Sequence, residues 1–284
     1  MAPRYTNCVF NMRARASCAA LRLSPSVRHA AFLRMSDRSS SLQSSGSDAL
    51  EIAVLGGFRF WMRGKDALPD LPGGSQRLLA FLALRERSVT RTAAAGSLWP
   101  EASEDHAHAS LRSAISRLTL IAHEAVVVTY HDLRLSDHVT VDIRESRALA
   151  HRLINPGDPE RDGDLSDRAI TALSADLLPD WYEDWAVIEA EDWRQLRLHA
   201  LDALTGRLVA SGRYADATSA ALAAVKAEPL RETSHAALIR VHLAEGNRGE
   251  ALAAFERYRA LLRTELGLEP SPVVQALIQD EQTL

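Results

Sequence analysis

Apolar residues alternate with polar ones where the patterned part of the chain begins. Every second residue of 50–54 is apolar, and the same two-residue period returns in 58–62 after the break at Gly56-Gly57. Successive side chains of a strand point to opposite faces, so this period predicts two strands of a small antiparallel sheet with one buried face. The sequence Gly64-Lys65-Asp66 predicts the turn that follows them.

The period then changes to that of amphipathic helices. The first helix is predicted to open at 73–75 with Ser75 as its N-cap, and the second to open at Thr90 and to stop before Pro100. The third should open at Ser103 and continue to about His123. Its first turn is acidic, which suits the positive end of the helix dipole.

A hairpin should follow the third helix. Residues 126–130 form one arm, His131-Asp132 the turn and 133–135 the return, and 139–141 can add another short strand. The order strand–strand–helix–helix–helix–hairpin is that of a winged helix-turn-helix with an N-terminal sheet. We therefore predict a winged helix DNA-binding domain over residues 49–142.

The rest of the chain, residues 143–284, is predicted to be an all-α domain. Its clearest loop is the Pro- and Gly-rich stretch 155–163. The expected helices are 142–154, 164–176, 183–211, 214–227, 231–245, 248–265 and 271–282.

An internal repeat supports a helical-repeat architecture. The sequence GRYADA at 212–217 returns as GNRGEA at 246–251, an offset of 34 residues. This offset is the tetratricopeptide period. The matched Ala217 and Ala251 are small, as closely crossing helices require. The fold class is thus mainly α: a winged helix with a small sheet and wing hairpin, then a tetratricopeptide-like domain.

Residues 1–48 have a different composition. Residues 1–47 hold seven Arg and one Asp, and the stretch ends in the polar run 36–48. The absence of periodicity predicts a disordered Arg/Ser-rich tail. An alternative is that translation starts at Met35, which leaves open whether 1–34 are translated. A transit peptide is a third interpretation, which we favour less.

Charge and cysteine content narrow the function classes. The net charge is −2 over residues 48–145 and −8 over 146–284, so the C-terminal part is not expected to bind nucleic acid through its bulk field. Both cysteines lie within the first 20 residues, which excludes a disulfide framework or a cysteine zinc site from the predicted domains. No apolar run is long enough to span a membrane. These features predict a cytoplasmic protein, and no cofactor or metal is expected.

The third helix carries the strongest candidate site. Its apolar stripe includes Leu111, Ala114, Ile115, Leu118 and Ile121. An anchored helix of this kind can present its polar face to the major groove, where Arg binds guanine and Ser contacts base or phosphate. A solvated face of an ordinary amphipathic helix is the alternative. The candidate DNA-binding residues are Arg112, Ser113, Ser116 and Arg117.

Two further segments can contact DNA in this arrangement. The turn residues Tyr130, His131 and Arg134 form the predicted wing, with Arg134 able to reach a phosphate or a narrow minor groove. Thr90 and Arg91 stand at a helix start and can offer backbone amides and a cation to phosphate. A plain surface turn and simple capping are the respective alternatives.

Aromatic and acidic residues after the loop are assigned to structure. Trp181, Tyr182, Trp185 and Trp193 are predicted to pack between helices rather than to bind a ligand. The acidic residues among them are expected to form a solvated face: Glu183, Asp184, Glu189, Glu191 and Asp192.

At this point the sequence resembles a known family. The strings VLGGF at 54–58, QRLLAFLALR at 76–85, LWP at 98–100 and LRSAISRL at 111–118 resemble the DNA-binding domain of SARP-type regulators (Streptomyces antibiotic regulatory proteins), which is similar to OmpR-type winged helices. The strings DLLPDWYEDW at 176–185, EPLRETSHAALIRVHLAEGN at 228–247 and ERYRALLRTELGLEPSP at 256–272 resemble the bacterial transcriptional activator domain.

The resemblance implies a transcription activator. Such a protein binds direct repeats in double-stranded DNA upstream of a promoter, contacts RNA polymerase or its sigma factor, and often acts as a homodimer. The family's Ser-Arg-Leu motif falls on Ser116, Arg117 and Leu118. Two positions depart from the family pattern: Thr119 replaces a basic residue, and Thr129-Tyr130 replaces a Gly-Tyr pair in the wing. Both bear on DNA affinity rather than on the fold.

Two other functions are open at this stage. The chain could be a protein-interaction helical-repeat module whose winged helix does not bind DNA, or a sensor whose helical domain binds a small molecule. No residue identifies such a ligand. The sequence contains no P-loop, G-x-S-x-G or G-x-G-x-x-G motif, so no enzyme is expected.

Overall fold

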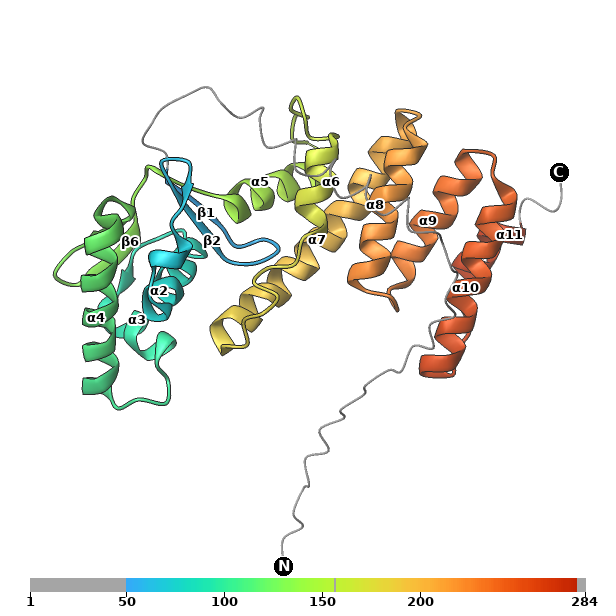
Figure 1. Cartoon of the computed structure of the whole chain (residues 1–284). Coiled ribbons are helices and arrows are strands. Elements are labelled where there is room, and N and C mark those ends of the chain that lie inside the picture. The colour runs from blue at the N-terminus through green and yellow to red at the C-terminus, as the bar shows by residue number, and fades with distance from the viewer. Residues whose placement is uncertain (1–49, 156, 280–284) are drawn as a thin grey trace, which may run out of the picture. The chain divides into compact units, whose positions relative to one another are not determined.

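Two small sheets and ten α-helices make up the described part of the chain, residues 50–155 and 157–279 of the computed structural model (Figure 1). The side chains of Thr119, Leu120, Ile121 and His123 are outside that description. The predicted tail 1–48 also lies outside the described residues. The described residues all belong to one compact unit.

The first sheet combines the two predicted N-terminal strands with a strand from far along the chain. Its order is β3-β2-β1-β7, with β1 antiparallel to β2 and parallel to β7. The predicted turn is wrong by one residue. Arg63 and Gly64 form it, with φ of 53° and 73°, because Met62 pairs with Lys65. The strands are β1 (Leu50–Ala53), β2 (Arg59–Met62), β3 (Lys65–Asp66) and β7 (Val139–Val141).

Three helices and the predicted hairpin follow. Thr90 caps α3 by accepting a hydrogen bond from Ala93 N at 3.2 Å, as predicted. The hairpin strands join a two-residue strand that precedes α3, in the order β4-β6-β5. The elements are α2 (Gly73–Ala83), β4 (Val89–Thr90), α3 (Arg91–Leu98), α4 (Glu104–Ala122), β5 (Val126–Val128) and β6 (Asp132–Leu135), with short 3-10 turns at Leu68–Asp70 and His123–Ala125.

The predicted N-cap of the first helix is wrong. The helix begins after Pro72, whose carbonyl accepts hydrogen bonds from the amides of Ser75 and Gln76. Ser75 therefore lies inside the first turn and is fully buried. Its hydroxyl donates instead to the Ala114 carbonyl of α4, 3.0 Å away. Proline suits the start of a helix because it has no amide hydrogen to satisfy there.

The remainder is helical, as predicted. The first and fourth helices of this part have the predicted bounds, and the second is shorter than expected at both ends. The last predicted helix extends to 282, of which residues beyond 279 lie outside the description. The helices are α5 (Asp142–Ile154), α6 (Asp167–Ser174), α7 (Asp184–Ala210), α8 (Tyr214–Ala227), α9 (Glu232–Ala244), α10 (Arg248–Leu266) and α11 (Pro272–Gln279).

The 34-residue repeat is visible in the helices themselves. The two repeat copies open α8 and α10, and in each a glycine with positive φ precedes the helix, Gly212 at 72° and Gly246 at 81°. Ala217 and Ala251 are both fully buried, as expected where helices cross closely. The described helices do not include one long and apolar enough to cross a membrane.

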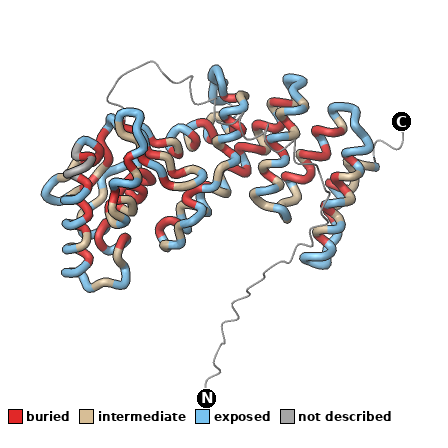
Figure 2. Tube along the Cα trace, viewed as in Figure 1, coloured by how far each residue is buried: buried red, intermediate tan, exposed pale blue. Residues whose placement is uncertain are grey.

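The apolar core runs without interruption from the first sheet into the helices (Figure 2). Phe81 of α2 packs edge-on against Trp185 of α7, with ring centroids 5.4 Å apart. Trp193 is buried and donates to the Ala175 carbonyl at 3.0 Å. The prediction that the aromatic cluster packs between helices holds for Trp185 and Trp193 and is wrong for Tyr182, which is 82% exposed.

One carboxylate joins the sheet to the helical part. Asp142, at the start of α5, accepts hydrogen bonds from the amides of Val54 and Leu55 at 3.0 Å, as well as from Ile143 N at 2.7 Å. The same stretch of chain pairs with the segment before α7, because Leu178 N donates to Val54 O at 2.9 Å. Asp142 thus fixes where α5 leaves the sheet.

We expect Asp142→Ala to lower the free energy of unfolding by roughly 2–3 kcal/mol, because buried amides would lose their acceptor. Asp142→Asn, which keeps one acceptor oxygen, should lose less. Urea denaturation of each variant measures the effect. Glu145→Ala is the matched control, since Glu145 is an exposed acid of the same helix that pairs with the exposed Arg168 and accepts none of the hydrogen bonds from the amides after β1. Equal losses in all three variants would contradict this role.

A buried histidine predicts a pH dependence. His235 on α9 stacks on Tyr258, with centroids 4.2 Å apart, and its Nε2 lies 2.8 Å from the Pro229 carbonyl. Burial lowers the pKa of His235 from 6.5. The unfolded chain then binds the proton more readily, so stability should fall as pH drops below 6.5. Unfolding experiments between pH 7.5 and 5 should show a smaller fall for His235→Gln than for wild type.

Candidate nucleic-acid interface

Helix α4 is held by its apolar face. Leu111, Ala114, Ile115 and Leu118 are buried, and α4 packs on both α2 and α3. The predicted stripe is therefore confirmed for these four positions, while the side chain of Ile121 lies outside the description. The Ser75 hydroxyl adds a hydrogen bond to the middle of the helix from behind. Burial of this face leaves the opposite one directed to solvent.

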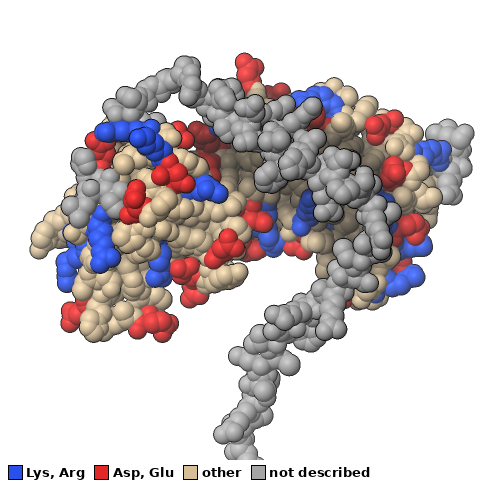
Figure 3. Space-filling view, viewed as in Figure 1, with Lys and Arg blue, Asp and Glu red and all other residues tan. Residues whose placement is uncertain are grey.

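The four predicted contact residues of α4 are brought together on that opposite face. Arg112, Ser113, Ser116 and Arg117 are all exposed. Neither arginine forms an ion pair with an acid among the side chains that the structure describes. Figure 3 shows acidic side chains at the lower end of α4, where its first turn holds Glu104 and Asp105, and basic ones higher up.

The wing tip presents two aromatic rings. Tyr130 is 87% exposed and meets His131 edge-on, with centroids 4.7 Å apart. The turn is closed by Thr129, whose amide donates to the Asp132 carbonyl at 2.9 Å and whose hydroxyl accepts from the Asp132 amide at 2.9 Å. Threonine in place of the expected glycine therefore takes part in the turn, through a hydroxyl that glycine lacks.

Arg91 and Arg134 do not join the exposed group. Arg91 N donates to the His131 carbonyl at 2.8 Å, and its guanidinium reaches the Thr129 carbonyl at 3.5 Å, so Arg91 ties the start of α3 to the wing. Arg134 donates to Asp137 at 2.9 Å and to the Leu135 carbonyl at 3.2 Å. Both predicted cations are thus engaged within the protein, and Thr90 is engaged as the cap of α3.

A cleft beside α4 adds residues that the sequence analysis missed. It has a volume of about 210 Å³ and is lined by Ser113 and Arg117 together with Ser110, Trp99 and Gly74. A Cβ at Gly74 would lie 3.8 Å from Ala114 Cβ, an ordinary van der Waals contact. Helical spacing could have identified Ser110, which precedes Ser113 by one turn, whereas the position of Trp99 depends on tertiary packing.

Comparison with known proteins identifies the family. The model of the bacterial transcriptional activator domain matches residues 141–280. The regulatory protein AfsR of Streptomyces coelicolor is 31% identical over 246 residues, and AfsR of Streptomyces griseus is 32% identical over 255 residues. This chain belongs to the SARP-type family.

The alignments cover 82% of this SARP-type chain but 24% of each AfsR, so the chain spans about a quarter of the length of these relatives. A solved structure, Mycobacterium tuberculosis EmbR in complex with a low-affinity phosphopeptide, matches with a TM-score of 0.58 at 23% identity. That match covers 82% of this chain and 65% of the EmbR chain, and it supports the fold alone. The family consists of transcription regulators and is not an enzyme family.

The Ser-Arg-Leu motif that carries part of the family resemblance lies on α4. Ser116 and Arg117 of this motif are exposed, whereas Leu118 is buried and anchors the helix. The departure at Thr119 lies outside the described side chains.

The support of α4 from behind can be tested with Ser75→Ala. Loss of a buried hydroxyl hydrogen bond should lower the free energy of unfolding by about 1 kcal/mol. Ser97→Ala, at an exposed position on α3, should change it by less than about 0.5 kcal/mol. Thermal unfolding followed by circular dichroism compares the two. A Ser75→Ala variant as stable as wild type would show that the bond to Ala114 contributes nothing.

Proposed function

We propose that this chain is a transcription activator that binds double-stranded DNA by inserting α4 into the major groove. The observation that carries the proposal is the exposed face of α4, where Arg112, Ser113, Ser116 and Arg117 lie opposite the buried residues of the apolar face. Arg can donate two parallel hydrogen bonds to guanine, and the serines can reach base edges or phosphates. Membership of a family of transcription regulators supports the same function.

The wing is assigned a supporting role in this proposal. Tyr130 and His131 are exposed polar aromatics that can contact the sugar-phosphate backbone next to the groove occupied by α4. Arg91 holds the wing in place through the His131 carbonyl rather than contacting phosphate itself. Thr90 and Arg134 likewise act through the protein, by capping α3 and by pairing with Asp137.

The DNA target, the oligomeric state and the protein partner that we propose are those that the family resemblance implies. The target would be direct repeats upstream of a promoter, which two copies of the chain could occupy as a homodimer. The acidic helical part would then contact RNA polymerase or its sigma factor. Its net charge of −8 over residues 146–284 favours contact with protein rather than with DNA phosphates.

We expect Arg112→Ala/Arg117→Ala to weaken binding to promoter DNA by at least tenfold. Each lost base or phosphate contact of this kind costs about 1–3 kcal/mol. The double variant should also lower the salt dependence of binding, because fewer counterions are released. Fluorescence anisotropy with DNA from the neighbouring promoters, at two salt concentrations, measures both effects.

Arg240→Ala is the matched control, since Arg240 is an exposed arginine on α9. It should bind DNA as wild type does. Negligible binding by wild type and double variant alike, on a broad set of DNA, would reject the proposal. The chain would then fit the alternative, a protein-interaction helical-repeat module whose winged helix does not bind DNA.

A further inference from the structure

A cavity lined by cations lies between the end of α2 and α5. Its volume is about 360 Å³, and its charged lining consists of Arg85, Glu86, Arg144, Arg147 and His151. We call it the seam cavity, because it lies where the winged helix meets the first helix of the helical part. Its size is within the range of small-molecule sites, near the lower end.

The cations of the seam cavity outnumber the acids that neutralise them. Arg85 and Arg147 share one carboxylate, that of Glu189 on α7, at 2.5 Å and 2.7 Å. Glu189 was expected on a solvated face, and that prediction is wrong, since its side chain is 14% exposed. With Glu86 counted as well, three guanidiniums face two carboxylates.

Arg144 is the cation with the fewest interactions. Its Nη2 donates to the Arg85 backbone carbonyl at 3.0 Å, and among the described residues no carboxylate pairs with it directly. Burial lowers the pKa of Arg144, although Glu86 and Asp137 oppose this from a distance. Arg144 is an exposed residue at the rim of the cavity, and the guanidinium donors not directed to Arg85 can bind an anion that accepts several hydrogen bonds.

We propose that the seam cavity binds a small anion that carries a phosphate or pyrophosphate group. Arg144 would bind it directly, and Arg147 and Arg85 would contribute through the side of each guanidinium not held by Glu189. The planar guanidinium matches phosphate oxygens in pairs, and the three guanidiniums carry more charge than the two carboxylates of Glu86 and Glu189 neutralise. The proposal does not depend on DNA binding.

An anion in the seam cavity would also affect the contacts between the winged helix and the helical part. Arg85 belongs to the winged helix and Arg147 to α5, and Glu189 joins them from α7. An anion that attracts either guanidinium competes with Glu189 for it. Binding would therefore change how strongly the two parts are held together, which is what the sensor hypothesis from the sequence requires.

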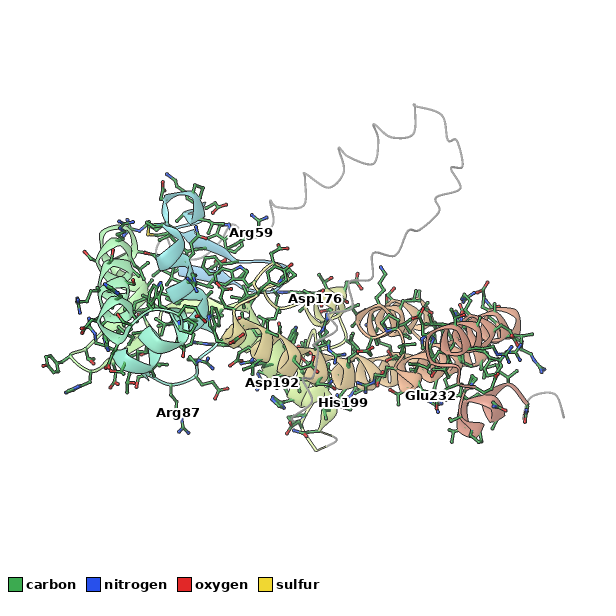
Figure 4. All side chains as sticks on the ribbon, turned by 90° about the horizontal axis from the view of Figure 1, so that it is seen from below. Arg59, Arg87, Asp176, Asp192, His199 and Glu232 are labelled. Atoms are coloured by element: carbon green, nitrogen blue, oxygen red, sulfur yellow. The ribbon has the colours of Figure 1, made fainter. Side chains whose placement is uncertain are left out.

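Isothermal titration of the full chain with sodium pyrophosphate, at constant ionic strength, tests the proposal. Wild type should bind about one equivalent, and Arg144→Ala should weaken binding at least tenfold. Arg87→Ala is the matched control, because Arg87 follows Arg85 closely in sequence, does not line the cavity and points away from the domain (Figure 4). It should bind within about twofold of wild type.

A second variant distinguishes loss of the binding site from loss of the fold. Glu86→Gln removes a carboxylate from the lining and should tighten pyrophosphate binding, an effect that a damaged fold would not produce. Orthophosphate in a parallel titration shows whether one phosphate group is sufficient. Absence of binding to wild type, or equal weakening by Arg144→Ala and Arg87→Ala, would overturn the proposal. If Arg144→Ala weakened only binding to duplex DNA, the seam cavity would be a DNA backbone contact and the proposal would be wrong.

Discussion

The arrangement of the two parts depends on the carboxylate of Asp142. Asp142 lies where β7 ends and α5 begins, and its carboxylate accepts hydrogen bonds from the amides of Val54 and Leu55, the two residues after β1. The same β1 end also binds the segment before α7, through Leu178 N and the Asp176 carbonyl. The residues after β1 are thus hydrogen-bonded on two sides by the helical part. Because these bonds are buried or half-buried, their loss would leave unpaired amides rather than solvated ones.

Apolar packing and ion pairs reinforce this junction in different ways. Phe81 and Trp185 extend the apolar core across the junction. This contact stabilises the packing of the two parts but does not fix their relative orientation, because the hydrophobic effect is not directional. Glu189, held between Arg85 and Arg147, adds direction, because charge-assisted hydrogen bonds require defined geometry. The ion pairs of Glu189 therefore orient the winged helix, and a bound anion would compete for them. The apolar contact between Phe81 and Trp185 would not be affected in this way.

Local patterns predicted most of the fold and part of the candidate site. The helices after Asp142, the 34-residue repeat and the outward face of α4 all follow from periodicity along one segment. Ser75 was assigned as a cap because the sequence does not show that Pro72 starts the helix or that α4 lies behind it. The DNA contacts of Arg91 and Arg134 stay predictions. Their partners within the protein, the Thr129 carbonyl and Asp137, could not be predicted because the tertiary fold of the wing determines them. The pairing of β7 with β1 joins residues nearly ninety positions apart, which no local period encodes.

The charge distribution constrains how such a protein can bind DNA. The chain carries a net charge of −4, and residues 48–145 alone carry −2, so its overall field does not attract a polyanion. Beyond about 10 Å that field is screened at ordinary salt concentrations, and only nearby charges matter. The arginines of α4 lie on one face, whereas Glu104 and Asp105 are confined to its first turn, at the end of the helix. Binding would then depend on a few short-range contacts that require the correct groove geometry. Such a balance weakens non-specific binding more than specific binding, because the former relies on the general phosphate attraction that this chain lacks.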